Sequence, residues 1–294
     1  MREKIFCHVR ESVYFCSMEQ KVILITGASS GIGRDTAQAL AAEGHKVYAA
    51  ARRMELMEPL KEQGITPLRM DVTDEQSMAE GVRFILDREG RIDVLVNNAG
   101  YGYFGPVENV AMAEARRQLE VNVFGLARLC QLVLPTMRAQ HSGRIINLSS
   151  VAGRTVIYFG GWYHVSKYSV EALSDAMRME LKPFGIDVVK IQPGAIGTDW
   201  GIIAADHLRQ SSEGTPYEEE GTRWARTMDK MYRSRFLSSP SVITRAILRA
   251  VDSRHPRTRY CTGRMAHLMV FFHNLLPARW WDAMMRTFSR LNIT

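Results

Sequence analysis

Short apolar runs alternate with amphipathic stretches along most of this chain. Each run is a few residues long and is followed by a glycine or a polar turn, which is typical of strands buried on both faces of a parallel sheet. The predicted strands lie at residues 21–27, 45–51, 65–72, 91–100, 143–150 and 185–194. A further strand is expected at residues 258–263.

The stretches between the runs have helical periodicity. We predict helices at 31–43, through Leu56 and Leu60, from Thr73-Asp74 to about 88, from 112 to 140 with a kink or end at Pro135, around 163–167, and at 241–252. Strands that alternate with such helices favour βαβ units with right-handed crossovers. The expected fold class is α/β: a single-domain, Rossmann-like, doubly wound parallel sheet flanked by helices. Such sheets bind ligands at the carboxyl ends of their strands.

Three segments depart from this alternation. Residues 1–17 lack the pattern, and charged residues interrupt any signal-peptide core, so we expect an extension outside a domain that spans 18–294. Residues 199–238 are polar, and because a loop of this length is usually functional, we expect a substrate loop or lid. Residues 264–294 are expected to form a C-terminal helical module.

The positive charge of the chain is concentrated near its C-terminus. The net charge is +7, and residues 223–294 hold 14 Lys and Arg against three acidic residues. No nucleic-acid motif accompanies this charge, so we expect no nucleic-acid partner and favour an anionic membrane surface or a solvated face. The apolar run of the C-terminal module is far shorter than the roughly 20 residues that span a bilayer. Three interpretations of the module stay open: packing over the core, a subunit contact, or an interfacial segment with peripheral membrane contact.

Cysteine and histidine form no cluster in the sequence. The four cysteines are scattered at positions 7, 16, 130 and 261 without a C-x-x-C pair, and the eight histidines make no ligand pattern. We therefore expect neither a disulfide framework nor a metal site. A reducing, cytoplasmic location fits this usage of cysteine.

The first predicted strand ends in the sequence TGASSGIG, which spans Thr26 to Gly33. Glycines at this spacing let a backbone turn tightly and approach a pyrophosphate at a helix N-terminus. The same stretch contains G-x-S-x-G, the nucleophile elbow of α/β-hydrolases, with Ser29 as the nucleophile. A hydrolase elbow normally follows several strands, and the sequence nominates no His or Asp partner. We therefore prefer dinucleotide binding and keep a serine hydrolase as an alternative.

Tyr163 stands four residues before Lys167 in the sequence YHVSK. On a helix this spacing places both side chains on one face, as either a solvated pair or a tuned acid. The motif belongs to an ordered set: TGASSGIG after the first strand, NNAG after the fourth, INLSS after the fifth, YHVSK on the next helix and PGAIGTD after the sixth. Over residues 20–200 the set resembles the short-chain dehydrogenase/reductase family. Residues 255–263 loosely resemble its steroid- and retinoid-acting branch.

The resemblance implies a catalytic group of four residues. Tyr163 would donate a proton to a carbonyl oxygen during reduction, or accept one during alcohol oxidation. Lys167, with the positive nicotinamide, would lower the phenol's pKa from its usual value of about 10 and would hold the nicotinamide ribose. Ser150 would orient the carbonyl, and Asn122 would fix a helix and a water linked to the lysine. A structural Asn122, bonded to backbone in a kinked helix, stays an alternative.

The end of the second predicted strand decides the expected cofactor. The resemblance implies an acid there for NAD(H), but Ala51 stands at that place and Arg52 and Arg53 follow. An arginine there accommodates the 2′-phosphate of NADP(H), so we expect NADP(H) rather than NAD(H), with Arg52 on the phosphate and Arg34 assisting. A solvated arginine pair is the alternative. The implied cofactor-binding residues are Gly27, Ser29, Ser30, Gly31, Ile32, Gly33, Arg52, Arg53, Asp71, Val72, Asn98, Ala99, Gly100, Tyr163, Lys167, Pro193, Gly194, Ile196 and Thr198.

The expected function is an NADP(H)-dependent oxidoreductase that interconverts a secondary alcohol and a ketone on an apolar substrate, such as a steroid, a retinoid or another lipid-like molecule. The expected assembly is a homo-oligomer, a dimer or a tetramer. Aromatic residues near the motifs are candidates for the substrate pocket: Tyr101, Phe104, Trp162 and Trp200. The rival hypothesis is a dinucleotide-binding sensor or scaffold without catalysis, which the joint presence of Ser150, Tyr163 and Lys167 disfavours.

Overall fold

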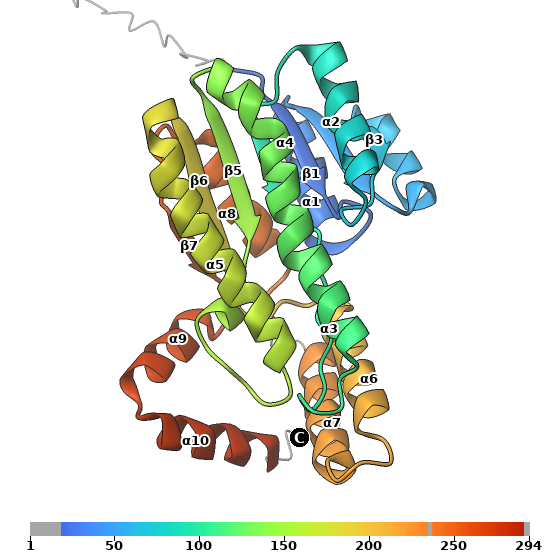
Figure 1. Cartoon of the computed structure of the whole chain (residues 1–294), viewed down its shortest axis with the longest axis vertical. Coiled ribbons are helices and arrows are strands. Elements are labelled where there is room, and N and C mark those ends of the chain that lie inside the picture. The colour runs from blue at the N-terminus through green and yellow to red at the C-terminus, as the bar shows by residue number, and fades with distance from the viewer. Residues whose placement is uncertain (1–18, 235–236, 291–294) are drawn as a thin grey trace, which may run out of the picture.

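The computed structural model describes residues 19–234 and 237–290 of the chain. In this part of the chain, strands in the order β3-β2-β1-β4-β5-β6-β7 form one parallel sheet (Figure 1). The sheet confirms the predicted α/β fold, whereas the extension predicted at residues 1–17 lies outside the described residues. The strands are β1 (Val22–Thr26), β2 (Lys46–Ala51), β3 (Thr66–Arg69), β4 (Val94–Asn97), β5 (Gly143–Leu148), β6 (Ile186–Pro193) and β7 (Arg259–Thr262).

The direction of winding reverses at β1. This strand pairs with β2 on one side and with β4 on the other. At such a point the chains that leave the two strands diverge, and a crevice opens at their carboxyl ends. The glycine-rich sequence follows β1 and the NNAG sequence follows β4, so the fold brings both motifs to the crevice.

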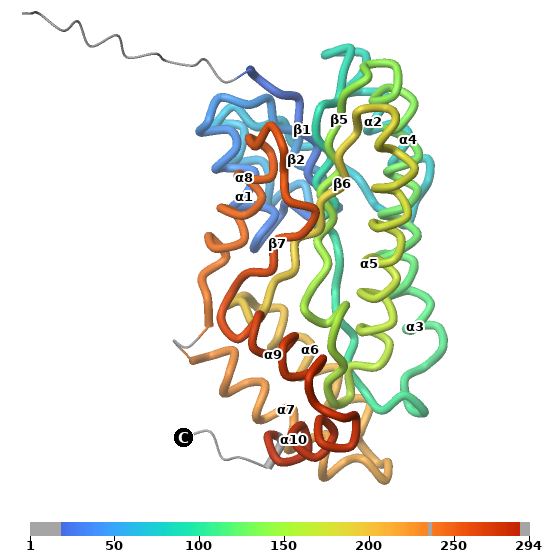
Figure 2. The backbone as a smooth tube through the Cα atoms, turned by 90° about the vertical axis from the view of Figure 1, so that its left-hand side faces the viewer, coloured from blue at the N-terminus to red at the C-terminus, as the bar shows by residue number. Residues whose placement is uncertain are grey.

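Helices cover both faces of the sheet (Figure 2). Side chains alternate along each strand, so Ile23 and Ile25 of β1 join one core while Val22 and Leu24 join the other. The apolar runs are continuous in sequence because both faces are buried. Residues of α1 (Gly31–Ala42) and α8 (Ser241–Asp252) close the first core, and residues of α2 (Glu75–Glu89), α4 (Leu126–Ala139) and α5 (Gly161–Leu181) close the second.

The helix expected through Leu56 and Leu60 is wrong in type. The chain forms two short 3-10 segments there, η1 (Met54–Leu56) and η2 (Glu58–Gln63), and Leu60 is buried whereas Leu56 is exposed. Pro59 explains the break, because its ring removes a backbone donor and clashes with the preceding turn.

The long helix expected from 112 to 140 is interrupted at a different place from the one predicted. The helix α4 continues through Pro135. The irregular part is a π-helical turn, η3 (Glu120–Gly125), which separates α4 from α3 (Met112–Leu119). This turn carries Asn122, and π-helical turns are frequent at functional sites.

The segment 199–238, expected as a polar loop, mostly forms a helical hairpin of α6 (Trp200–Ser212) and α7 (Glu218–Arg233). Apolar residues at helical spacing, among them Leu208 on α6 and Trp224 on α7, pack together in a separate core cluster. Charged residues on the outer faces made the segment look like a loop. The hairpin lies beyond the carboxyl ends of the strands, where a substrate would enter (Figure 1).

The C-terminal module is helical, as predicted. Helices α9 (Ala266–Leu275) and α10 (Ala278–Arg290) form an arm at the same end of the molecule as the α6–α7 hairpin (Figure 1). Helix α10 packs against α9 within the arm and against α7 of the hairpin. None of the described helices is both long enough and apolar enough to cross a bilayer.

Candidate active site

Helix α5 brings Tyr163 and Lys167 to one face, as the sequence predicts. Both side chains are buried, and the Lys167 ammonium lies 5.9 Å from the centre of the Tyr163 ring. The ammonium also donates a hydrogen bond of 2.8 Å to the carbonyl oxygen of Leu148, at the end of β5. This contact holds the helix against the carboxyl end of the sheet.

Ser150 lies beside the phenol, just after β5. It begins the short segment η4 (Val151–Gly153), and its hydroxyl accepts a hydrogen bond of 3.1 Å from the amide of Ala152. The same hydroxyl donates to the carbonyl oxygen of Pro193 at 3.4 Å and shares a hydrogen bond with Tyr163. The ends of β5 and β6 and the first turn of α5 therefore meet at one hydroxyl group.

Burial sets the protonation of the tyrosine and the lysine. It raises the pKa of Tyr163 to about 12, and the hydrogen bond with Ser150 acts in the opposite direction. It lowers the pKa of Lys167 to about 8, and the negative charge of Glu171 acts in the opposite direction. In the protein alone desolvation therefore dominates the pKa of Tyr163, and the lowering that Lys167 and the positive nicotinamide together would cause stays a prediction. At neutral pH the phenol keeps its proton, as a proton donor must.

Asn122 links the π-helical turn to the chain after β4. Its amide oxygen accepts from the backbone N–H of Tyr101 at 3.0 Å, and its amide nitrogen donates to the Tyr101 carbonyl oxygen at 2.9 Å and to the Ser166 hydroxyl at 3.0 Å. A Cβ built on Gly100 would lie 3.1 Å from Oδ1 of Asn122 and 3.8 Å from Nζ of Lys167. Asn122 thus bonds backbone within an irregular helix, as the structural alternative expects. Its link to the lysine through a water stays a prediction.

A cavity of about 410 Å³ opens at the carboxyl ends of β1, β2 and β4. Tyr101 lies in its wall together with many of the predicted cofactor-binding residues, which therefore converge on one site. These residues are Gly27, Ser29, Ser30, Arg52, Arg53, Asp71, Val72, Ala99 and Gly100.

The glycine-rich turn after β1 has the shape that a pyrophosphate requires. Gly27 and Gly31 have φ values of 66° and 54°, which side chains rarely adopt. A Cβ on Gly33 would lie 2.4 Å from Nδ2 of Asn98 and 2.5 Å from the carbonyl oxygen of Gly27, so only glycine fits there. Asn98 braces the turn by donating to the carbonyl oxygens of Thr26 at 2.9 Å and Gly27 at 3.2 Å. The first turn of α1 is thereby fixed at the edge of the cavity, and a dinucleotide fits this arrangement.

The ordered motifs and this geometry match one family of enzymes. A model of the short chain dehydrogenase family covers residues 21–206, more than half of the chain. The chain belongs to the short-chain dehydrogenase family. The predicted resemblance is therefore confirmed, and with it the prediction that the protein is an oxidoreductase.

Named relatives are similar to this dehydrogenase over most of their length. It is 35% identical to the 3-ketodihydrosphingosine reductase of Bacteroides thetaiotaomicron, over 86% of this chain and 91% of that protein. It is 32% identical to retinol dehydrogenase 16 of Rattus norvegicus, over 94% and 90%. A solved metagenomic short-chain oxidoreductase in complex with NADP is 25% identical with a TM-score of 0.66, covering 83% of this chain and 97% of that one. The dehydrogenase thus uses a nicotinamide dinucleotide and acts on a small molecule.

The surroundings of Ser29 do not support the alternative that it is the nucleophile of a serine hydrolase. The hydroxyl of Ser29 accepts a hydrogen bond of 3.1 Å from the guanidinium group of Arg53. A guanidinium group stays protonated and cannot take a proton from a serine. The G-x-S-x-G sequence therefore serves the glycine-rich turn.

Some of the remaining predicted cofactor-binding residues face the glycine-rich turn, and others pack elsewhere in the fold. A Cβ on Gly31 would lie 3.8 Å from Cγ2 of Thr198, so Thr198 faces the glycine-rich turn across the crevice. Gly194 instead donates its amide to the carbonyl oxygen of Thr262 at 2.8 Å, which ties this chain to β7. Ile196 and Ile32 pack with the hydrophobic core of the α1 face rather than in the cavity wall.

Aromatic rings pack around the phenol of Tyr163. The ring of Trp200 lies 5.0 Å from that of Tyr163 and 5.9 Å from that of Phe104. Tyr232 of α7 lies 6.2 Å from Trp200. Phe104 and Trp200 therefore lie beside the phenol in the core cluster with α6 and α7, and their place in a substrate pocket stays a prediction, whereas the predicted Tyr101 lines the dinucleotide cavity. Trp162 is half-buried at the start of α5.

Several residues of this site have no signal in the sequence. Tyr232 lies in the segment expected to be a loop, and Glu114, Arg117 and His207 line the dinucleotide cavity from α3 and α6. Each belongs to a helix whose position depends on long-range packing, so no local motif marks it. A helical pattern search over residues 200–233 would have placed the hairpin, although not the contacts of its side chains.

His164, which adjoins the tyrosine, is structural. It is buried, and its Nε2 accepts a hydrogen bond of 3.1 Å from the amide of Ile157. Its Nδ1 therefore carries the proton and donates to the carbonyl oxygen of Ala152 at 2.9 Å. Burial lowers the pKa of His164. The neutral ring thus fastens the chain between Ser150 and Tyr163.

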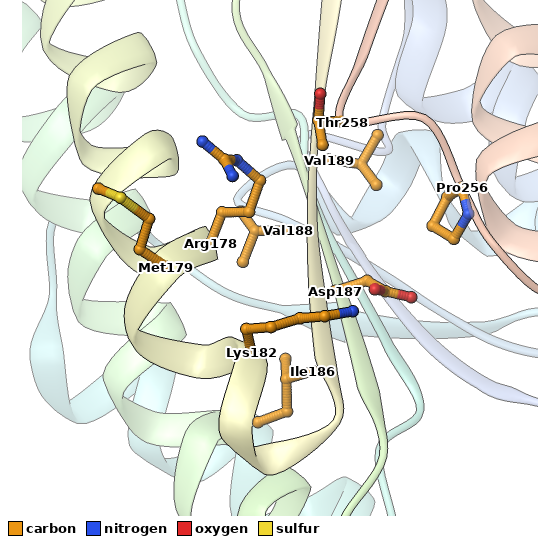
Figure 3. Close-up of a pocket in the computed structure, with 9 residues that line it drawn as sticks. All are labelled: Arg178, Met179, Lys182, Ile186, Asp187, Val188, Val189, Pro256 and Thr258. Carbon is orange, nitrogen blue, oxygen red and sulfur yellow. The ribbon is translucent and has the colours of Figure 1, made fainter.

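A second hollow, of about 450 Å³, lies at the far end of α5 (Figure 3). The charged ends of Arg178, Lys182 and Asp187 edge it, and apolar side chains of β6 form its floor. Tyr163 and Arg178 are about 22 Å apart along the helix at 1.5 Å per residue. This hollow therefore does not belong to the active site.

Proposed function

We propose that the dehydrogenase is an NADP(H)-dependent enzyme that interconverts a secondary alcohol and a ketone on an apolar substrate. One observation carries the proposal: the hydrogen-bonded pair of Ser150 and Tyr163, with Lys167 on the same helical face, packs against aromatic rings. Lys167 also faces Gly100, which lines the dinucleotide cavity together with two arginines. A scaffold would need the cavity but not the buried acid.

In the reductive direction Tyr163 donates its proton to the carbonyl oxygen of the substrate. Ser150 donates a hydrogen bond to the same oxygen and so orients it. The nicotinamide, when bound, supplies the hydride to the carbonyl carbon. Lys167 keeps a positive charge beside the phenol, which stabilises the phenolate that remains after proton transfer. Asn122 holds the backbone of Tyr101 through two hydrogen bonds and so fixes the chain after β4, which lies next to Lys167.

The preference for NADP(H) rests on the end of β2. Ala51 is buried there and offers no carboxylate to ribose hydroxyls. Arg52 and Arg53 both line the cavity, and Arg53 reaches across to the hydroxyls of Ser29 at 3.1 Å and Ser30 at 3.4 Å. A 2′-phosphate at this edge of the cavity would find two guanidinium groups and two hydroxyl donors.

The preference for a lipid-like substrate rests on the rings around Tyr163. Phe104, Trp200 and Tyr232 offer planar apolar surfaces and no charge. The names of two relatives, a 3-ketodihydrosphingosine reductase and a retinol dehydrogenase, describe lipid-like substrates. Both observations favour a long or polycyclic apolar ketone over a sugar.

Decay of NADPH fluorescence with a panel of ketones tests the proposal. The panel contains a 3-keto sphingoid base, a keto steroid and a hydrophilic keto sugar, and each is repeated with NADH. We expect turnover of an apolar ketone with NADPH as the better reductant. If the protein binds NADPH but neither reduces any of the ketones nor oxidises any of the corresponding alcohols, the sensor or scaffold hypothesis is favoured. Turnover of the sugar alone would contradict the substrate class.

We further propose a cytoplasmic enzyme whose C-terminal arm contacts an anionic membrane surface peripherally. Large apolar side chains are exposed along one face of α9, at the i, i+3, i+4 and i+7 positions Leu268, Phe271, Phe272 and Leu275. Residues 264–290 carry four arginines, at 264, 279, 286 and 290, in a stretch with a single acidic residue, Asp282. The arm lies at the same end of the molecule as α6 and α7 (Figure 1), which carry Trp200 and Tyr232. A membrane there would deliver apolar substrate to the site.

We also propose that two or more copies of the chain associate. A different face of the molecule exposes Phe124 of η3 together with Val165 and Tyr168 of α5. Because η3 packs against α5, these side chains lie on neighbouring elements. An exposed apolar area of this kind is typical of a subunit contact.

A further inference from the structure

A buried cluster of charged groups continues the catalytic face of α5. One turn after Lys167 comes Glu171, and one turn later comes Asp175. Lys190 of β6 bridges the two carboxylates, with distances of 3.1 Å to Glu171 and 2.6 Å to Asp175. Arg259 of β7 lies 3.3 Å from Glu171. The side chain of Lys190 is 2% exposed and that of Glu171 is 9% exposed, so the core of this cluster is away from water.

The carboxylate of Glu171 has a fixed position. Its Oε1 accepts a hydrogen bond of 2.7 Å from the amide of Gln192, while Lys190 and Arg259 hold its Oε2. A Cβ on Gly153 would lie 2.8 Å from Cγ of Glu171 and 2.8 Å from the carbonyl oxygen of Lys167. Glycine at this place lets the carboxylate stem pass close to the turn that carries the lysine.

We propose that Glu171 is a positioning residue for Lys167: held by Lys190, Gln192 and Arg259, its carboxylate keeps the neighbouring ammonium charged and seated at the end of β5. The proposal rests on the proposed function, because it concerns the charge that Lys167 contributes there. Glu171 does not line the dinucleotide cavity. It acts through the lysine.

The energetic need for such a residue follows from burial. Lys167 donates to a neutral carbonyl oxygen, that of Leu148, and desolvation lowers its pKa to about 8. Glu171 supplies the opposing negative charge. The titratable groups that surround Lys167 and its partners come from α5, β6, β7 and α7: Tyr163, Glu171, Asp175, Lys190, Arg259 and Tyr232. Of these groups, Glu171 is the carboxylate one turn from the lysine.

The change Glu171→Gln tests the proposal with a side chain of the same shape. Loss of the carboxylate destabilises the ammonium, so the pKa of Lys167 should fall. In ketone reduction the rate declines at high pH when the first group of the pair loses its proton, and this group is Lys167 rather than Tyr163. We expect the pH at which kcat declines to shift down by about one unit, with kcat at lower pH within a few-fold of wild type.

Two variants of the same cluster serve as controls. Asp175→Asn disturbs the same salt bridges one turn farther from Lys167 and should leave the decline of kcat where it is. Arg259→Gln removes a cation beside Glu171 from a side chain that is 36% exposed, so it should fold even if Glu171→Gln does not. It should shift the decline to higher pH. An unshifted profile in folded Glu171→Gln, equal shifts in Glu171→Gln and Asp175→Asn, or a downward shift in Arg259→Gln would each overturn the proposal.

A readout without substrate separates this proposal from the proposed function. The protein is labelled with [13C]lysine, and the Lys167 signal is assigned by its loss in Lys167→Arg. In wild-type protein this signal should titrate near pH 8, and in Glu171→Gln it should titrate lower. If no ketone is reduced but the signal shifts, the proposed function fails while the role of Glu171 stands. If ketones are reduced and the signal is the same in both proteins, the role of Glu171 is wrong.

Discussion

The indole N–H of Trp281 donates a hydrogen bond of 2.7 Å to the carbonyl oxygen of Val156. Val156 lies in the chain between Ser150 and Tyr163, and Trp281 is a buried residue of α10. Its ring also packs edge-on against His273 of α9 at 4.9 Å. One side chain therefore ties both helices of the C-terminal arm to the loop that joins the proposed catalytic residues Ser150 and Tyr163.

Replacement of Trp281 should loosen the arm and the loop together. Trp281→Phe keeps most of the packing and loses the hydrogen bond, at a cost of about 1 kcal/mol. Trp281→Ala loses both, at roughly 3–5 kcal/mol, and should lower Tm by several degrees. We expect KM for an apolar ketone to rise in the same order while KM for NADPH stays near wild type. Thermal melts and steady-state kinetics check this, and equal effects of both variants would contradict it.

Tyr163→Phe tests the proton donor. The change removes one hydroxyl and leaves the ring packed against Trp200 and Phe104. We expect NADPH affinity to remain near wild type and kcat to fall by roughly 10²- to 10⁴-fold, the usual contribution of a general acid. Fluorescence titration and turnover with the same ketone measure the two quantities. Activity within a few-fold of wild type would show that another group supplies the proton.

Arg52→Ala and Arg53→Ala test the cofactor preference. Loss of a charge-assisted contact to the 2′-phosphate should cost about 1.5–3 kcal/mol, which is roughly 10- to 150-fold in KM for NADPH. NADH lacks this phosphate, so its KM serves as the internal control and should change little. Arg53→Ala also removes the hydrogen bonds that Arg53 donates to Ser29 and Ser30, so this variant should add a small rise in KM for NADH to the larger rise for NADPH. A wild-type preference for NADH would falsify the assignment.

Charge placed on the exposed face of η3 and α5 tests self-association. Val165→Asp with Tyr168→Glu should convert an oligomer into a monomer, because two buried charges would face each other across the contact. Light scattering coupled to size-exclusion chromatography gives the mass of each form. Met179→Glu, an exposed position at the far end of the same helix, is the control. A monomeric wild-type chain, or an unchanged oligomer in the double variant, would contradict the assignment of this face.

The sequence could predict the sheet and the catalytic pair because both are local features. A parallel strand that is buried on both faces appears in the sequence as one continuous apolar run. Tyr163 and Lys167 lie on one face because they are four residues apart on a helix. The glycine-rich turn is local as well, since Gly27, Gly31 and Gly33 act within one loop.

The missed features all depend on contacts between distant segments. Tyr232 approaches Tyr163 only because α7 packs on α6, and Glu171 gains its partners from β6 and β7. In the sequence Glu171 looks like an ordinary charged residue on a helix. The raised pKa of Tyr163 in the protein alone was missed for a related reason: the degree of burial, which raises that pKa, depends on the whole fold.

If the C-terminal arm contacts a membrane, its binding to vesicles should depend on anionic lipid and on salt. The charge of its arginines is worth about 1 kcal/mol per basic residue near anionic lipid and is screened by salt. The apolar face of α9 adds affinity in proportion to the area that it buries. We therefore expect the protein to sediment with anionic vesicles at low salt, to do so less at high salt, and to stay in the supernatant with neutral vesicles.

Two variants separate the apolar from the electrostatic contribution to vesicle binding. Phe271→Glu with Leu275→Glu removes two exposed apolar side chains from α9 and should abolish sedimentation at every salt concentration. Arg279→Gln should weaken binding at low salt only. Val107→Glu changes an equally exposed apolar residue outside the arm and should have no effect. If wild-type protein stays in the supernatant with anionic vesicles at low salt, the arm does not contact membranes, and its exposed face must be assigned to a subunit contact instead.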